Sequence, residues 1–145
     1  MEITSSAFAN GGAIPQEYTC DGKNLSPPIS ISGVPDGAKS LILITDDVDA
    51  PSGVFTHWVV FDMYPGTTRV DSGSTPEGTQ GVNAFGKEYY SGPCPHAGTH
   101  RYYFRLYAVD TLLKLPAGSN RDKVEPAMKG HVLETCELMG TYMKR

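Results

Sequence analysis

The chain has 145 residues, of which 39% are hydrophobic, and its formal net charge is −4. This apolar content supports one folded core over residues 1–145 and excludes wholesale disorder, while the absence of a basic cluster excludes an electrostatic footprint for nucleic acid. No apolar run approaches the ~20 residues of a membrane span, and the first twelve residues lack the pattern of a signal peptide.

Sixteen glycines and eleven prolines interrupt helices and favour short strands joined by turns. Weak alternation over residues 2–8 predicts an edge strand. Residues 15–28 form a loop, because they contain an Asp-Gly turn and a Pro-Pro stop. A short strand follows at 29–32, before the turn VPDG at 34–37. The continuous apolar run LILIT at 41–45 is typical of a strand that is buried on both faces.

The second half of the chain holds two more strong strands. HWVVFDM at 57–63 is rich in β-branched and aromatic residues, which favour strands, and a long polar loop follows at 66–83. RYYFRLYAV at 101–109 has two different faces, because side chains alternate along a strand. One face carries Tyr102, Phe104, Leu106 and Ala108, and the other carries Arg101, Tyr103, Arg105 and Tyr107.

The tail changes from strand to helix periodicity. Asn120 is a suitable helix cap, and apolar residues recur at helical spacing at Val124, Met128, Val132 and Cys136. Proline fits only the first turn of a helix, so we expect the regular part to begin near Pro126, and 138–143 to end the chain as a short strand. The whole pattern predicts a mainly β protein, an antiparallel sandwich with one late helix.

Three segments place ionisable groups at the ends of predicted buried strands. TDDVDAP at 45–51 follows the first strand, His57 opens the second and His100 precedes the third. If these strands are neighbours, the groups that converge are Asp47, Asp49, His57, His100 and Tyr102. Imidazoles and a tyrosine hydroxyl donate hydrogen bonds, and the backbone at Gly92 and Pro93 could form an anion nest. This set predicts a binding site for a small anion such as a phosphate ester, without a cofactor or metal.

Other interpretations of the same residues remain open. The acidic loop can be a solvated turn, and His57 can be a structural histidine. A hydrolase would use Cys94 as nucleophile, His100 as base and Asp47 as the orienting group. A metal site at Cys94, His96 and His100 would need side chains that share a face, which a Pro-Gly-rich segment does not provide.

The number of cysteines indicates the redox state of the cellular compartment. Three of them, Cys20, Cys94 and Cys136, are an odd and sparse set, which favours free thiols and a reducing, cytoplasmic location over a disulfide framework. Cys94, between two prolines, is expected to be a buried, inert thiol. A single bridge from Cys94 to either Cys20 or Cys136 is the alternative.

Several motifs resemble the phosphatidylethanolamine-binding protein family, in the bacterial and archaeal branch often labelled Raf-kinase-inhibitor-like. The resemblance covers nearly the whole chain. It is carried by SSAF, IPQEYTCDGKNLSPP, DDVDAP, THWVVFDM, GVNAF, GPCPHAGTHRYYFRLYAVD and AMKGHVLETCELMGTY. It implies a sandwich of a large and a small sheet with the late helix at one end. It also implies a preformed pocket for phosphate, acetate or a phosphoethanolamine head group, and binding rather than catalysis.

The resemblance also assigns residues. It implies that the pocket is formed by Asp47, His57, Gly92, Pro93, His100 and Tyr102, with Asp49, Pro51 and Arg101 in support. The family usually has proline where this chain has Val48; a cis bond before valine costs a few kcal/mol, so we expect a trans bond. His96 replaces a smaller residue and adds a third imidazole near the mouth. Eukaryotic relatives regulate kinases and some inhibit proteases, so a regulatory role and a protein partner of that kind are further expectations. Bacterial relatives often look dimeric, so a homodimer is another.

Overall fold

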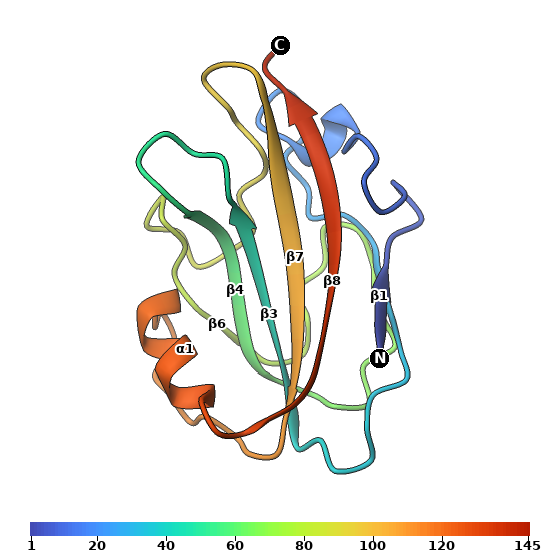
Figure 1. Ribbon diagram of the computed structural model, residues 1–145, viewed down its shortest axis with the longest axis vertical. Helices are drawn as coiled ribbons and strands as arrows, with labels where there is room; N and C mark the ends of the chain where they lie inside the picture. Colours follow the sequence, from blue (N-terminus) through green and yellow to red (C-terminus); the bar gives the residue numbers. More distant parts are fainter.

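Two antiparallel sheets form the protein in a computed structural model that describes residues 1–145 (Figure 1). The large sheet has the order β6-β4-β3-β7-β8, with strands Thr79–Gln80, Phe55–Met63, Ser40–Asp47, Thr99–Val109 and Val132–Met143. The small sheet has the order β1-β2-β5, with strands Glu2–Thr4, Ile29–Ser32 and Arg69–Val70. The predicted sandwich is confirmed. The two expected loops are not wholly irregular, because one contains β5 and β6 and the other a 3-10 turn, η1, at Gln16–Tyr18.

The central strand β3 supplies two separate hydrophobic cores. All eight of its residues are buried, which confirms the prediction of a strand covered on both faces. Leu41 and Leu43 point into the core between the sheets, whereas Ile42 and Ile44 belong to a second core on the outer face of the large sheet. This double burial holds the end of β3 rigidly.

The helix α1, Arg121–Met128, covers the lower part of the large sheet's outer face (Figure 1). Its cap is the Asn120 side chain, which accepts from the Lys123 N–H at 3.1 Å. Two details of the prediction are wrong: Pro126 lies inside the helix, and the helix ends at Met128 instead of continuing to Cys136. Residues 132–143 form β8, which pairs with β7 along nearly its whole length, and this pairing outweighs the helical spacing.

The N-terminal segment covers part of the outer edge of β8. The N–H groups of Gly11 and Ile14 donate to the carbonyls of Met139 and Thr141, each at 2.7 Å, and the Thr141 N–H donates to Gly12 O at 2.9 Å. These bonds satisfy backbone groups that an edge strand leaves unpaired.

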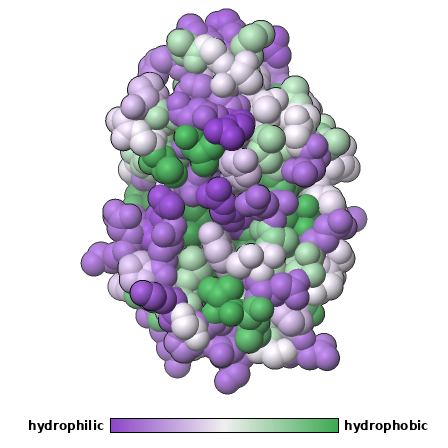
Figure 2. Space-filling view, viewed as in Figure 1, coloured by the Kyte–Doolittle hydropathy of each residue, from purple (hydrophilic) through white to green (hydrophobic).

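The surface seen in Figure 2 mixes polar residues with small, separate apolar patches. No helix in the structure has the length and apolar character needed to cross a membrane.

Candidate functional site

The strands β4, β3 and β7 are neighbours, and the polar residues predicted at their ends meet at one end of the large sheet. Asp47 is the last residue of β3 and pairs with Phe55 on one side and Tyr102 on the other. A cavity of about 260 Å³ opens beside this junction. Its lining consists of Asp47, Ala50, Pro51, Ser52, Phe55, His57, Phe85, Cys94, Pro95, His96 and His100.

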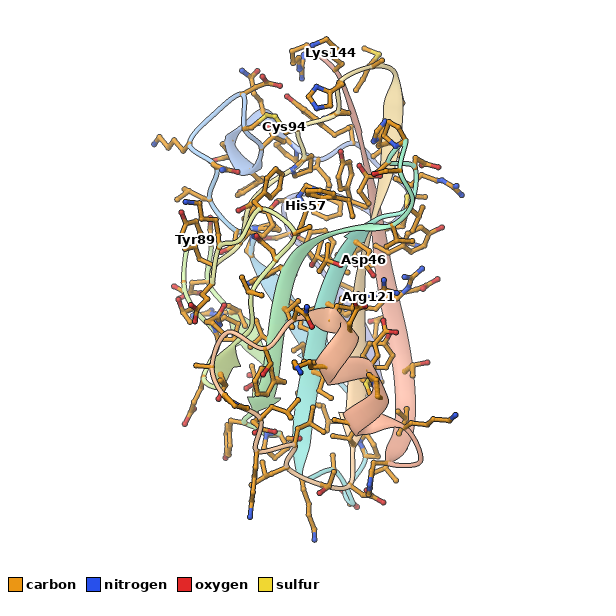
Figure 3. The ribbon with its side chains drawn as sticks, turned by 90° about the vertical axis from the view of Figure 1, so that its left-hand side faces the viewer. Asp46, His57, Tyr89, Cys94, Arg121 and Lys144 are labelled. Carbon is orange, nitrogen blue, oxygen red and sulfur yellow. A yellow bond between two sulfur atoms is a disulfide. The ribbon has the colours of Figure 1, made fainter.

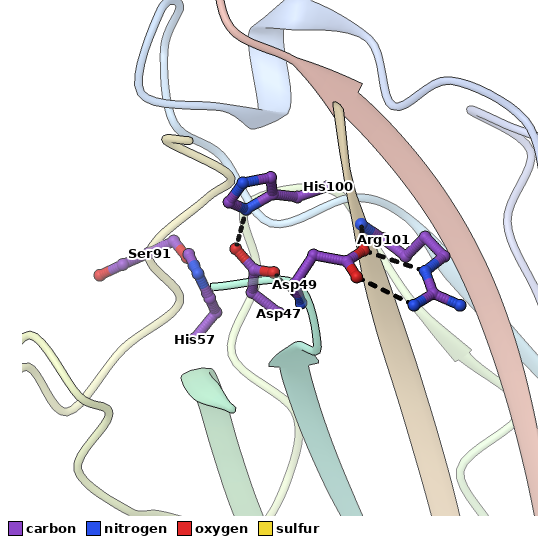
Figure 4. Close-up of polar contacts among 6 residues, drawn as sticks. All are labelled: Asp47, Asp49, His57, Ser91, His100 and Arg101. Carbon is purple, nitrogen blue, oxygen red and sulfur yellow. Dashed lines mark hydrogen bonds and ion pairs between the residues drawn. The ribbon is translucent and has the colours of Figure 1, made fainter. Parts of the chain in front are cut away.

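His100 and Asp47 form a buried pair in the cavity wall. The His100 Nδ1 lies 2.6 Å from Asp47 Oδ2 (Figure 4), and the two side chains are only 10% and 6% exposed. The carboxylate accepts a hydrogen bond from the Nδ1–H group, so Nε2 is the ring nitrogen that remains for a ligand. When His100 is neutral its Nε2 is an acceptor, and when it is protonated Nε2 becomes a donor.

His57 is held in the same manner by a backbone acceptor. Its Nδ1 donates to the Ser91 carbonyl at 2.6 Å, which again leaves Nε2 as the available nitrogen. Burial lowers the pKa of His57 below its ordinary value of 6.5. Burial therefore keeps this imidazole neutral at neutral pH, and a bound negative charge would oppose that effect.

Tyr102 lies against both imidazole rings, behind the residues that line the cavity. Its ring centroid is 5.3 Å from that of His57 and 6.4 Å from that of His100. The hydroxyl oxygen is buried and makes no well-aligned hydrogen bond, although the Asp47 carboxylate and the Cys94 backbone lie near enough to affect it. Burial, with the nearby Asp47 carboxylate, raises the pKa of Tyr102 well above its ordinary value, so the group stays a neutral donor. A buried donor without a well-aligned partner is costly.

The loop after β3 is tied to the start of β7. Arg101 donates to the Asp49 carboxylate through its backbone N–H, Nε and Nη2, each at 2.9 Å (Figure 4). These bonds lower the pKa of Asp49 to about 2. The Asp49 N–H in turn donates to Asp47 Oδ1 at 2.8 Å. The peptide bond before Val48 is trans, as predicted.

Asp46 belongs to a different site on the other face of β3. Its carboxylate accepts from Thr56 Oγ1 at 2.8 Å and lies 3.6 Å and 3.5 Å from guanidinium nitrogens of Arg105 and Arg121. Figure 3 shows Asp46 beside Arg121 at the beginning of α1. Burial raises the pKa of Asp46 despite these partners. The adjacent carboxylates of Asp46 and Asp47 therefore lie on opposite faces of β3 and interact with different groups.

Gly92 and Pro93 are buried beside the cavity and are not among the residues that line it. The Gly92 N–H donates to Asn24 Oδ1 at 2.8 Å, and Pro93 O accepts from the Cys20 N–H at 3.1 Å. A Cβ at Gly92 would collide with the backbone of Tyr18 and Thr19. The glycine therefore allows close packing, and its N–H already has a partner within the protein.

Cys20 and Cys94 form a disulfide across 74 residues of sequence, so the favoured prediction of free thiols is wrong and the alternative of a Cys20–Cys94 bridge is confirmed. Both cysteines are exposed, which also corrects the expectation of a buried thiol. The bridge removes the nucleophile of the hydrolase alternative and the thiolate of the metal cluster. The expectation of a reducing, cytoplasmic compartment rested on free thiols and loses that basis.

Two aromatic residues of the cavity were missing from the predicted site. Phe55 and Phe85 pack edge to face, with ring centroids 4.8 Å apart, and Phe85 also contacts the His57 ring at 5.3 Å. Asn83 fixes the turn that carries Phe85, because its Oδ1 accepts from the N–H groups of Phe85 and Lys87 at 2.9 and 3.0 Å. Its Nδ2 is 3.0 Å from each of three oxygens: His57 O, Tyr89 O and Ser91 Oγ.

Comparison with known proteins gives the family. Residues 4–143 match the family model described as phosphatidylethanolamine-binding protein. A UPF0098 protein from Methanothermobacter thermautotrophicus is 51% identical, over 99% of each chain.

Two crystal structures share the fold. A PEBP homologue from Chlamydia trachomatis has a TM-score of 0.95 at 42% identity, covering 99% of this chain and 97% of that one. The E. coli protein YbcL, described as a member of the mammalian PEBP family, has a TM-score of 0.89 at 29% identity, with 99% and 98% covered. None of these descriptions states an enzymatic activity. With nearly the whole chain matched in sequence and in fold, this protein belongs to the phosphatidylethanolamine-binding protein family.

Proposed function

We propose that the protein binds small anions, phosphate esters above all, in the cavity at the ends of β3, β4 and β7. The observation that carries the proposal is the pair of imidazoles in one cavity wall, each with Nδ1 held by an internal acceptor. Both Nε2 atoms remain for a ligand, and the Tyr102 ring packs against both imidazoles.

Binding of an anion at this site requires a proton. Neutral imidazoles present lone pairs at Nε2, which repel a fully ionised oxyanion. Binding therefore needs a proton on one ring or on the anion itself, for example on a monohydrogen phosphate oxygen. A bound anion favours the protonated imidazole, so affinity falls as the pH rises through the histidine titration.

Free phosphate, acetate-like anions and the phosphoethanolamine head group all contain the oxyanion that this site would recognise. A regulatory role through a phosphorylated protein partner, such as a kinase or a protease, would use the same oxyanion. No covalent step is part of the proposal.

The test is an NMR titration of backbone amide shifts with inorganic phosphate and with O-phosphoethanolamine. We expect saturable shifts at Asp47, His57 and Tyr102 in the wild type, lost in His100→Ala. The matched control is His131→Ala, because His131 also pairs with an aspartate, Asp110, at 2.7 Å, but outside the cavity. Absence of saturable shifts with both compounds, or equal binding by His100→Ala, would refute the proposal.

A further inference from the structure

The Cys20–Cys94 disulfide lies at the surface of the protein instead of in a core. Both cysteines are exposed, and neither belongs to the two hydrophobic clusters. Figure 3 shows Cys94 among the upper loops, away from α1. Exposed disulfides are the ones that an external thiolate can attack, and they are more often labile than buried ones. A thiol reagent can therefore reach this bridge in the folded protein.

The two loops that the bridge joins are also held together by bonds that do not involve sulfur. The Gly92 N–H donates to Asn24 Oδ1 at 2.8 Å. The hydroxyl of Tyr90 donates to Tyr18 O at 2.8 Å, and both of these tyrosines are buried. Opening of the disulfide should therefore leave the sandwich folded and the two cysteines close to each other.

The segment that begins at Cys94 depends on the bridge more than its neighbours do. Residues 94–97 form no backbone–backbone hydrogen bond, whereas Pro93 O before them and Gly98 O after them both accept one. The disulfide is the one covalent link from this segment to another loop. Reduction should therefore release residues 94–97 selectively.

We propose that the Cys20–Cys94 bridge is a redox modification site that a dithiol reductant opens in the folded protein. A thiolate of the reductant bonds to one cysteine sulfur, the Cys20–Cys94 bond breaks, and the other cysteine leaves as a thiolate that takes up a proton. The second thiol of the reductant then displaces the remaining cysteine. The two electrons come from the dithiol, which becomes a disulfide, and an excess of that disulfide reverses the exchange.

A dithiol is the class of reductant that fits, because the two cysteines stay close after the first step. The released cysteine has a high effective concentration, so it attacks the mixed disulfide and closes the bridge again. A monothiol such as glutathione competes poorly with this return. A dithiol removes the mixed disulfide by an equally intramolecular step.

The reduced protein should have the same sandwich and a more mobile cavity wall. Cys94, Pro95 and His96 belong to the lining of the cavity, and all three lie in the released segment. An effect of reduction on anion affinity would rest on the proposed function, whereas the redox change itself does not depend on it.

The experiment uses the Cys136→Ala variant, because Cys136 is the free cysteine and every thiol counted then comes from the bridge. The oxidised variant is incubated without denaturant in reduced dithiothreitol, and thiols are alkylated with iodoacetamide at intervals and counted by mass spectrometry. We expect two alkylated cysteines per chain, at a rate proportional to the dithiothreitol concentration. A rate that does not depend on this concentration would overturn the proposal, because the bridge would then open only through unfolding.

Glutathione at the same thiol concentration is the control for the class of reductant. It should leave most of the protein bridged, and reduction as complete as that by dithiothreitol would overturn the choice of a dithiol.

Amide NMR spectra of the two redox states locate the change. We expect shifts around Cys20 and broadening over residues 94–97, unchanged amides in β3 and β8, and recovery of the first spectrum in excess oxidised dithiothreitol. The Cys20→Ser/Cys94→Ser variant should match the reduced state. Collapse of the whole spectrum, or changes at the two cysteines alone, would overturn the proposal. A phosphate titration of both states separates the two proposals, because absence of binding in either state contradicts anion recognition and leaves the redox result intact.

Discussion

Removal of the Cys20–Cys94 bridge should destabilise the protein strongly. The bridge joins residues 74 positions apart, and the chain-entropy relation for a loop of that length gives about 4.4 kcal/mol at 25 °C. Measured values commonly fall below this relation, so we expect a loss of about 3 kcal/mol. For a chain of this size that loss lowers Tm by roughly 10 °C.

The native fold should survive the loss, because other bonds join the same segments. The Cys20 N–H donates to Pro93 O at 3.1 Å, and the Tyr90 hydroxyl donates to Tyr18 O at 2.8 Å. Two-state urea unfolding of the oxidised protein and of the Cys20→Ser/Cys94→Ser variant therefore measures the difference. The single, buried Trp58 provides the fluorescence signal.

The m-value should also rise in the variant, because an unfolded chain without the cross-link exposes more surface. Cys136→Ala is the control for loss of a cysteine as such, since Cys136 is the free one, and it should not change the m-value. A difference in the free energy of unfolding below about 0.5 kcal/mol, between the bridged protein and the double variant, would refute the entropic reasoning.

Three further predictions concern the residues around the cavity. Burial lowers the pKa of His57 below 6.5, so the unfolded chain binds a proton at this residue more readily than the folded chain does. The stability due to neutral His57 is therefore present above about pH 6.5, and it is lost as the pH falls toward the lowered pKa. Urea unfolding from roughly pH 8 to pH 5 in phosphate-free buffer should show a steeper loss in wild type than in His57→Gln; equal slopes would contradict the assignment. Asn83→Ala should cost about 3 kcal/mol of unfolding free energy and broaden the amide signals of residues 84–91, whereas an unchanged spectrum would show that the turn does not need this side chain. Gly92→Ala should cost at least about 2 kcal/mol, because its Cβ collides with the backbone of Tyr18 and Thr19, and a stable variant would show that this packing can relax.

The strongest strands were predictable because their signals are local. LILIT and HWVVFDM are continuous apolar runs, and both lie in the centre of the large sheet. Residues 132–143 were harder, because β8 is a half-exposed edge strand whose conformation depends on pairing with β7. Gly130, at φ +84°, was the available sign that the helix ends before this segment.

Some residues of the candidate site were predictable from local sequence signals, and others were not. Asp47, His57 and His100 could be grouped from the sequence because each stands at the end of a recognisable strand, and in the structure all three line one cavity. Phe85 and Asn83 lie in a loop without periodicity, so their position follows from hydrogen bonds that the sequence does not reveal. Pairing of Cys20 with Cys94 likewise depends on two distant loops that meet only in the folded chain.

The N-terminal cover of β8 has a consequence for how copies of this protein can associate. Because residues 11–14 occupy backbone groups at Met139 and Thr141, another chain cannot add a strand at that part of the edge. Deletion of this segment would uncover a long edge strand, which is a template for intermolecular strand pairing and aggregation. Any strand-to-strand dimer of the intact protein along β8 must therefore use the other half of that edge, near Val132 and Leu133, whose side chains are 40% and 46% exposed.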